Sequence, residues 1–374
     1  MKSAFLHGEL KEEIYVQQPA GFMKKGKEEK VYKLRKALYG LKQAPRNWYN
    51  KIEAYFARNG FERCFCEHTL FTKSTKGGKI LIVSLYVDDL IYTRNDGSMC
   101  DDFKSSMMSK FDMTDLGRMR YFLGVEVLRN AHGIFIYQMN YAQEVLSWFG
   151  MKDCNAVKNL IVPRTKMSEN DAGTKVDATL FKQVVGSLMY LTATRPDLMY
   201  GVSLINRFMA NPTETHWFAA KRILRYLKGA TKFGIFYKKG ENTKIIAYTD
   251  SDFVGDIDDR KSTSGFVFSL GTGAVSWSSK KQPVVTLSTT EAEYIVVASC
   301  ACQCIWIKRI LETFGFREQK NIRVYVTAIQ LFSCLKIQYF MEGVNILILD
   351  SFFKRSGQGW KHQAELLQHS ESIG

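Results

Sequence analysis

The feature that most constrains this chain is a pair of adjacent aspartates inside an apolar stretch. Residues 81–92 read LIVSLYVDDLIY, so Asp88 and Asp89 interrupt a run that otherwise favours a strand. Burying two carboxylates is costly unless something compensates their charge. We therefore expect a tight β-hairpin that displays both acids at its tip, where divalent cations can neutralise them. The alternative for this segment alone is an ordinary acidic turn.

Composition bounds the class of protein. The chain has 374 residues, 46% of them hydrophobic, which is enough for two or three cores at roughly 100–200 residues per domain. There is no secretion signal, and the longest apolar runs, such as residues 80–86, are short of the ~20 residues that a membrane span needs. These features predict an intracellular protein, cytoplasmic or nuclear. The net charge of +15 suits a polyanionic partner, although many basic proteins bind no nucleic acid.

The eight cysteines are scattered, apart from a pair at 64 and 66 and a group at 300, 302 and 304. Alternate-residue spacing without a second Cys or His cluster is a poor zinc pattern, and no disulfide framework is evident. We expect reduced core cysteines.

Helical patterns dominate the middle of the chain. Residues 152–177 are hydrophilic and predict a connecting loop, and residues 178–229 predict helices. The clearest helix covers residues 215–228, preceded by the sequence NPT and closed by Gly229. Its Lys221, Arg225 and Lys228 share one face, which is either a solvated surface or a nucleic-acid contact.

Strand patterns begin near residue 243. We expect a strand at 244–249 and a hairpin of 265–270 with 274–277 across the sequence GTG. The sequence STTE at 288–291 is a capping box that opens an apolar helix to about Leu311. Asp250 ends the first strand and Glu293 lies near the start of this helix, so both carboxylates are expected near one edge of an α/β unit. Asp252 and Asp256 are expected to be loop acids.

Several sequence words resemble the reverse transcriptases of copia-type retrotransposons. YVDD at 86–89 resembles the reverse transcriptase signature. The copia-type family in particular is resembled by six further segments: KSAFLHG at 2–8, LYGLKQAPR at 38–46, YFLGVE at 121–126, GSLMYL at 186–191, TRPD at 194–197 and YTDSD at 248–252. They follow the family's order to about residue 318. The chain thus resembles a truncated fragment of a copia-type LTR retrotransposon Pol polyprotein, with reverse transcriptase followed by ribonuclease H.

The resemblance implies two catalytic sites, each using two Mg²⁺ ions, with Mn²⁺ as a substitute. Asp88 and Asp89 would be catalytic metal ligands for polymerisation, and Asp250 and Glu293 for ribonuclease H. Glu291 is better explained as the capping partner of Ser288, which assigns Glu293 to the metal.

Other matched positions imply contacts with substrates. Phe5 and Gln43 match nucleotide-binding residues, with plain packing or surface exposure as the alternative, and the primer grip matches Tyr121, Phe122, Leu123 and Gly124. The implied partners are an RNA template, a DNA primer, RNA–DNA hybrid and deoxynucleoside triphosphates, with no membrane.

The implied fold class is α/β: an α+β palm, a helical thumb and connection, and a ribonuclease H-like α/β domain. We assign residues 1–128 to partial fingers and palm, 129–240 to thumb and connection, 241–318 to an incomplete ribonuclease H-like domain, and 319–374 to an aberrant tail.

The chain also departs from the family. The motif ending at residues 2–8 normally starts with Asp-Val, so a metal-binding aspartate is expected just before Met1, with the fingers segment upstream. Residues 323–331 resemble the sequence on both sides of the third ribonuclease H carboxylate, but they contain no Asp. Residues 338–348, when back-translated and read one nucleotide earlier, can give a sequence that resembles the C-terminus of the family's ribonuclease H. We therefore expect a frame change and a catalytically defective fragment, so whether this chain is an enzyme stays open. The alternatives are a host-retained nucleic-acid-binding protein without catalysis and an intact enzyme whose start is misplaced.

Overall fold

The computed structural model describes residues 4–163, 165–171, 173–240, 244–316, 322–326 and 344–348. The chain forms two compact units: unit 1 comprises Met1–Gly117 with Trp306–Arg317, and unit 2 comprises Arg118–Ile305 with Glu318–Gly374. Helices and strands are mixed in both, which fits the predicted α/β class. The predicted domain boundaries after residues 128, 240 and 318 differ from this division and stay predictions.

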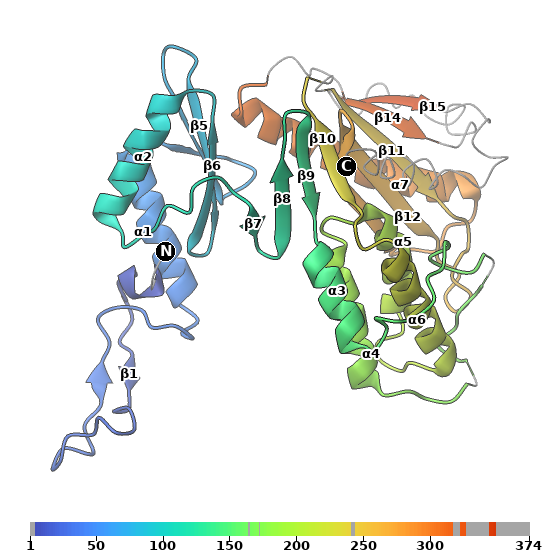
Figure 1. The fold of residues 1–374 in the computed structure, drawn as a ribbon, viewed down its shortest axis with the longest axis horizontal. Helices are drawn as coiled ribbons and strands as arrows, with labels where there is room; N and C mark the ends of the chain where they lie inside the picture. The colour runs from blue at the N-terminus through green and yellow to red at the C-terminus, as the bar shows by residue number, and fades with distance from the viewer. Residues whose placement is uncertain are drawn as a thin grey trace. The chain divides into compact units, whose positions relative to one another are not determined.

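Unit 1 is built on a four-stranded antiparallel sheet of order β3-β4-β5-β6. Its strands are β3 (Glu62–Arg63), β4 (Leu70–Ser74), β5 (Ile80–Tyr86) and β6 (Asp89–Arg94). Helices α1 (Ala44–Arg58) and α2 (Gly97–Lys110) lie together beside this sheet (Figure 1). In β5, Leu81, Val83 and Leu85 are buried while the intervening residues are half-buried, so one face of the sheet packs on the helices.

The core of unit 1 is mainly aromatic. Trp48, Ile52 and Phe56 recur along one face of α1 and are at most 1% exposed. They pack in one cluster with buried residues from the N-terminal segment, the sheet, α2 and the chain beside them: Ala4, Phe61, Phe71, Leu81, Val83, Leu85, Phe103, Met107 and Phe111. Three short elements complete unit 1: η1 (Ala4–His7) and the pair β1 (Tyr15–Val16) and β2 (Tyr32–Lys33).

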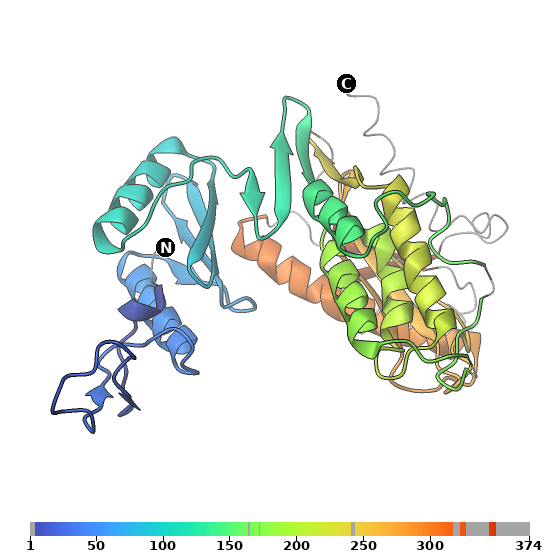
Figure 2. The same cartoon turned by 60° about the horizontal axis from the view of Figure 1, so that its bottom comes forward.

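Unit 2 begins with a four-stranded antiparallel sheet of order β10-β9-β8-β7 and a group of helices. The strands are β7 (Tyr121–Phe122), β8 (Val125–Arg129), β9 (Gly133–Tyr137) and β10 (Gly234–Lys238). The helices are α3 (Met139–Trp148), α4 (Ala178–Leu191), η2 (Pro196–Leu198), α5 (Met199–Asn206) and α6 (Glu214–Gly229), and Figure 2 shows α3 to α6 packed side by side. In the described residues between α3 and α4 there is no helix or strand, as the hydrophilic stretch predicts.

The predicted helix of residues 215–228 is α6. Thr213 caps its N-terminus: its side chain accepts from the backbone of His216, whose Nδ1 accepts from the Thr213 amide at 3.0 Å. The sequence predicted where this helix starts and ends, but it did not predict that His216 takes part in the cap.

A buried ion pair fixes the helices of unit 2. Arg195 is 1% exposed, and its Nε and Nη2 donate to the Asp197 carboxylate at 2.9 and 2.7 Å. Nη1 donates to the Ala230 carbonyl at 2.7 Å, and the Tyr226 hydroxyl donates to Asp197 at 3.0 Å. The TRPD motif therefore has a structural role, because both of its charged side chains have partners within the core.

The second sheet of unit 2 has the order β13-β12-β11-β14-β15. Its strands are β11 (Ile245–Ser251), β12 (Thr263–Leu270), β13 (Gly273–Lys281), β14 (Ile322–Val326) and β15 (Val344–Ile348). The first three pair antiparallel, whereas β14 runs parallel to β11 and β15 runs parallel to β14. Both β14 and β15 fall within 319–374, the segment assigned to an aberrant tail, most of which lies outside the described residues.

Helix α7 (Thr289–Thr313) follows this sheet in the chain. Among the described residues it is the one helix whose length and mean hydropathy of 1.5 would allow it to cross a membrane. Core helices meet the same criteria, and Val296, Cys300 and Cys304 are buried along one face of α7. The helix is thus weak evidence for a span.

Candidate functional site

The two adjacent aspartates lie at the tip of a tight hairpin in unit 1, as expected. Tyr86 pairs with Asp89 across β5 and β6, which leaves Val87 and Asp88 as a two-residue turn. Asp88 is half-buried and Asp89 is exposed. Both carboxylates are therefore presented where the apolar strands end.

The turn has a strained backbone that a neighbouring indole holds. Val87 has φ = 53°, a left-handed conformation that is rare for β-branched residues, with a cost of roughly 1–3 kcal/mol. The Trp48 Nε1 donates to the Val87 carbonyl at 2.6 Å, and Trp48 is 1% exposed. The core of unit 1 thereby fixes the turn next to Asp88. Sequence reasoning missed Trp48, because its spacing with Ile52 and Phe56 is that of a core residue.

Phe5 and Gln43 lie in the same unit, beside the first half of α1. Phe5 is half-buried in η1, with its ring 5.6 Å from that of Tyr39. The His7 ring of η1 lies 6.1 Å from Trp48, and Gln43 is the N-cap residue of α1, with its side chain making no cap bond. Unit 1 therefore gathers Phe5, Gln43 and the hairpin acids around α1.

The residues matched to the primer grip form a second tight turn, in unit 2. Phe122 pairs with Val125, so Leu123 and Gly124 make the turn, with φ of 46° and 75°. The Tyr190 hydroxyl of α4 donates to the Leu123 carbonyl. A Cβ at Gly124 would lie 2.2 Å from that hydroxyl. Tyr190 thus holds this turn as Trp48 holds the other.

Asp250 and Glu293 lie in unit 2, on β11 and near the start of α7. Asp250 is exposed and pairs with Gly265, and Glu293 is 6% exposed. The residues next to them, Ser251 and Ala292, are bonded by one buried side chain: the Gln282 Nε2 donates to the Ala292 carbonyl at 2.8 Å and lies 3.2 Å from the Ser251 Oγ.

The Gln282 amide also donates to the Ser264 Oγ at 2.8 Å, and Gln282 is 3% exposed. It ties the end of β11, the start of β12 and the first turn of α7 at one point. Its position directly after β13 carries no signal in the sequence, so Gln282 was not predicted.

Glu291 caps α7, as predicted, with a small difference in geometry. The Ser288 Oγ accepts from the Glu291 amide at 3.1 Å, whereas the Glu291 carboxylate accepts from the Leu287 amide at 2.7 Å rather than from Ser288.

Asp256 organises the loop that follows β11. Its Oδ2 lies 3.1 Å from Nη1 of Arg207 and 2.9 Å from Nζ of Lys281. Burial alone would raise the pKa of Asp256, but Lys281 and the backbone amides of Asp258 and Asp259 outweigh it and hold the pKa at about 2.

Asp252 differs from Asp256. Burial raises the pKa of Asp252, while its Oδ1 accepts from the Thr263 amide at 2.6 Å. Both acids are loop residues, as expected, yet Asp256 has the larger structural role.

The basic face of α6 is partly used within unit 2. The Arg225 Nε donates to the Asn155 carbonyl at 2.8 Å, and Lys221 lies 5.2 Å from the Trp217 ring centroid. Arg225 thus has a partner within unit 2, while the two alternatives for this face, a solvated surface or a nucleic-acid contact, stay predictions.

Carboxylates are the ligands that Mg²⁺ prefers. In the part of the chain that the structure describes, no group of three or more Asp, Glu, His or Cys side chains is close enough to hold a metal. Each candidate site thus brings at most two carboxylates from the described residues. This donor set fits Mg²⁺, which commonly binds one or two carboxylates and completes its shell with water and substrate phosphates.

The comparisons with known proteins identify the family. Residues 1–163 match the family described as reverse transcriptase (RNA-dependent DNA polymerase). The chain is 38% identical over 331 residues to the retrovirus-related Pol polyprotein from transposon TNT 1-94 of Nicotiana tabacum, a match that covers 86% of the chain and 25% of that protein. It is 40% identical over 325 residues to the Pol polyprotein from transposon RE1 of Arabidopsis thaliana, with 87% and 22% covered.

A shorter relative is covered almost completely. The chain is 33% identical over 299 residues to a putative transposon Ty5-1 protein of Saccharomyces cerevisiae, which covers 79% of the chain and 97% of that protein. These similarities define the class of protein as a fragment of a retrotransposon Pol polyprotein. The chain belongs to the Pol family of copia-type retrotransposons, and it spans about a quarter of the length of the plant polyproteins.

Proposed function

We propose that this chain contributes RNA-directed DNA polymerase residues in unit 1 and a ribonuclease H-like domain in unit 2. The observation that carries the proposal is the β5–β6 hairpin, which presents Asp88 and Asp89 at a turn fixed by Trp48. It lies within the residues that match the reverse transcriptase family.

In the polymerase site, Asp88 and Asp89 would hold Mg²⁺, which supplies positive charge for in-line displacement at the nucleotide phosphate. Trp48 fixes the position of these carboxylates through the Val87 carbonyl, so that the loaded site needs little reorganisation. Phe5, packed on Tyr39, would limit the space beside the sugar of a deoxynucleoside triphosphate. The Gln43 side chain, which makes no cap bond, would contact the same nucleotide.

The turn at Leu123 and Gly124 would position the DNA primer on its template. Two residues with positive φ and the Tyr190 hydroxyl make this turn stiff, and a stiff turn suits a part that orients a reacting end.

The ribonuclease H-like assignment has support from the sheet of unit 2. Three antiparallel strands followed by two parallel ones place Asp250 on the central strand β11. Asp250 and Glu293 would hold Mg²⁺ next to an RNA–DNA hybrid. The last described residue of β14, Val326, pairs with Thr249, the neighbour of Asp250. The next residue in the sequence is Thr327, outside the described residues, and residues 323–331 have the flanks of the family's third carboxylate but no aspartate. We therefore propose that hydrolysis is defective.

The experiment is cleavage of a labelled RNA–DNA hybrid by the full chain with Mg²⁺ or Mn²⁺, compared with Thr327→Asp and with the double variant Thr327→Asp/Asp250→Asn. We expect the wild-type chain to match the background of Asp250→Asn, and Thr327→Asp to raise cleavage at least 10-fold. The double variant should return to background. Cleavage by the wild type above the Asp250→Asn control would contradict the proposed defect.

Primer extension on the same preparations tests unit 1. Extension that disappears in Asp88→Asn supports the polymerase proposal. The net charge of +15 favours one alternative, a nucleic-acid-binding protein without catalysis. That alternative requires tight, salt-sensitive binding of primer–template with neither extension nor cleavage.

A further inference from the structure

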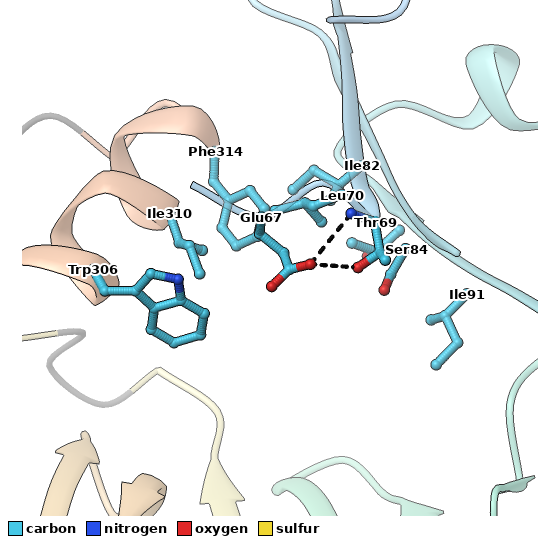
Figure 3. Close-up of a pocket in the computed structure, with 10 residues that line it drawn as sticks. Glu67, Thr69, Leu70, Ile82, Ser84, Ile91, Trp306, Ile310 and Phe314 are labelled. Atoms are coloured by element: carbon cyan, nitrogen blue, oxygen red, sulfur yellow. Dashed lines mark hydrogen bonds between the residues drawn. The ribbon is translucent and has the colours of Figure 1, made fainter. Parts of the chain in front are cut away.

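The sheet of unit 1 has a second face, opposite the aromatic core, and a cavity of about 400 Å³ lies against it (Figure 3). This volume is within the range of roughly 300–1,000 Å³ found for small-molecule sites. Neither the hairpin carboxylates nor Phe5 and Gln43 line it.

One wall of the cavity is made by cross-strand pairs on β5 and β6. Ser84 pairs with Ile91 and Ile82 pairs with Thr93, so all four side chains project from the same face of the sheet. Leu70 of β4, 7% exposed, completes this wall. The wall is aliphatic at its centre, with hydroxyl groups at Ser84 and Thr93.

The opposite wall is the last part of α7, which belongs to unit 1. Trp306 and Ile310 of α7 and Phe314, the residue that follows the helix, recur at four-residue intervals and line the cavity. Two contacts with the β3–β4 loop hold this segment: the Trp306 Nε1 donates to the Cys66 carbonyl at 3.3 Å, and the Cys64 Sγ lies 3.4 Å from the Thr313 Oγ1. The aromatic wall is therefore anchored next to the sheet.

The cavity has one charged side chain, Glu67. Its Oε1 accepts from the Thr69 hydroxyl at 2.7 Å and from the Thr69 amide at 3.2 Å, so the carboxylate has a defined orientation. Figure 3 shows the other carboxylate oxygen directed toward the open space beside the Trp306 ring. A negative charge next to an indole ring favours a cation, because the ring face also attracts positive charge.

We propose that this cavity binds a small aromatic ammonium compound. Its ring lies between Ile82 and Ile91 on one side and Trp306 and Phe314 on the other, and its ammonium group donates to Glu67. The apolar walls supply most of the affinity, and the carboxylate selects the charge. This site does not depend on the polymerase proposal, because its walls and charge are independent of the hairpin acids.

The test uses two probes of matched ring size and opposite charge, 2-naphthylmethylammonium and 2-naphthoate, titrated calorimetrically into the full chain. We expect the ammonium probe to bind at least 10-fold more tightly. In Glu67→Gln this preference should fall below about 3-fold, since the charge is lost while the size is kept. The matched control is Glu62→Gln, an exposed carboxylate on β3 in the same unit, which should leave the preference unchanged.

A second variant tests the location. Ile310→Trp adds volume to the helix wall and should weaken both probes at least 10-fold, while amide hydrogen exchange of unit 1 confirms the fold. Equal affinity for the two probes in the wild type would overturn the charge assignment. Unchanged binding of the ammonium probe in Ile310→Trp would overturn the site itself.

Discussion

The two units place carboxylates at a candidate site by different physical means. Unit 1 has an aromatic core, and among its described residues Thr72 is the one polar residue that is buried. Its hairpin is fixed by ring packing and by one hydrogen bond from an indole. Unit 2 buries Arg195, Asp256, Gln282 and Glu293, and its acids lie beside a network of hydrogen bonds. Packing tolerates many substitutions of similar volume, whereas a buried polar network fails when one member is lost. The two sites should therefore differ in what breaks them.

The largest expected effect is in unit 2, from Asp197→Asn. The substitution leaves the buried Arg195 guanidinium without its counter-charge, and we expect a loss of roughly 3–5 kcal/mol in the free energy of unfolding. Hydrogen exchange read by mass spectrometry in increasing urea reports each unit separately. Protection should fall in unit 2 and stay unchanged in α1 and α2. A variant as stable as the wild type would show that the ion pair is not needed.

Gln282→Leu should cost unit 2 roughly 2–3 kcal/mol, since several buried acceptors lose their donor. The control is Gln303→Leu, at a half-buried residue whose Nε2 donates to the Ser276 hydroxyl at 3.1 Å, where we expect a loss of less than about 1 kcal/mol. Chemical denaturation measures both. If the two variants lower the free energy of unfolding equally, the three bonds of Gln282 do not make it more important than Gln303.

Trp48→Phe should cost unit 1 roughly 1–2 kcal/mol, because the ring still fills the core while the bond to the Val87 carbonyl is lost. Exchange should accelerate at the hairpin more than in the rest of the sheet. Trp148→Phe, at a 59% exposed position in unit 2, is the control and should be nearly neutral. If the hairpin amides exchange at the wild-type rate, the Val87 turn is held by something other than Trp48.

The smallest expected effect is the pH dependence from Asp256. Its pKa in the folded chain, about 2, is below the ordinary value of about 3.9. Its stabilisation is therefore present above about pH 4 and is lost as the pH falls toward 2. We expect about 1 kcal/mol of this acid-induced loss to be absent in Asp256→Asn. Denaturation at several pH values checks it, and parallel curves for the two proteins would refute it.

Much of the local structure was predictable, because it follows from short-range patterns. The hairpin at Asp88 and Asp89, the start and stop of α6, the β12–β13 pair and the capping of α7 by Glu291 each depend on residues close in sequence. The family was also predictable, since long words such as LYGLKQAPR carry it. The roles of Asp88, Asp89, Asp250 and Glu293 in catalysis stay predictions.

What could not be predicted involves residues far apart in the chain. Trp48 reaches Val87 across 39 positions, and Tyr190 reaches Leu123 across 67. Neither has a local signal, because a buried Trp at helical spacing and a Tyr in an apolar helix read as core. Gln282 could not be predicted for the same reason, because its acceptors belong to three elements that are separate in the sequence.

The close approach of Tyr190 to Gly124 also constrains how these sequences diverge. Because a Cβ at position 124 would lie 2.2 Å from the Tyr190 hydroxyl, a change at either position affects the other. A side chain at 124 requires the Tyr190 ring to shift or to be replaced, and the φ of 75° disfavours most side chains there in any case. Copies of the element that accumulate changes should therefore more often lose the tyrosine before the glycine, an order that can be read from the ages of related copies.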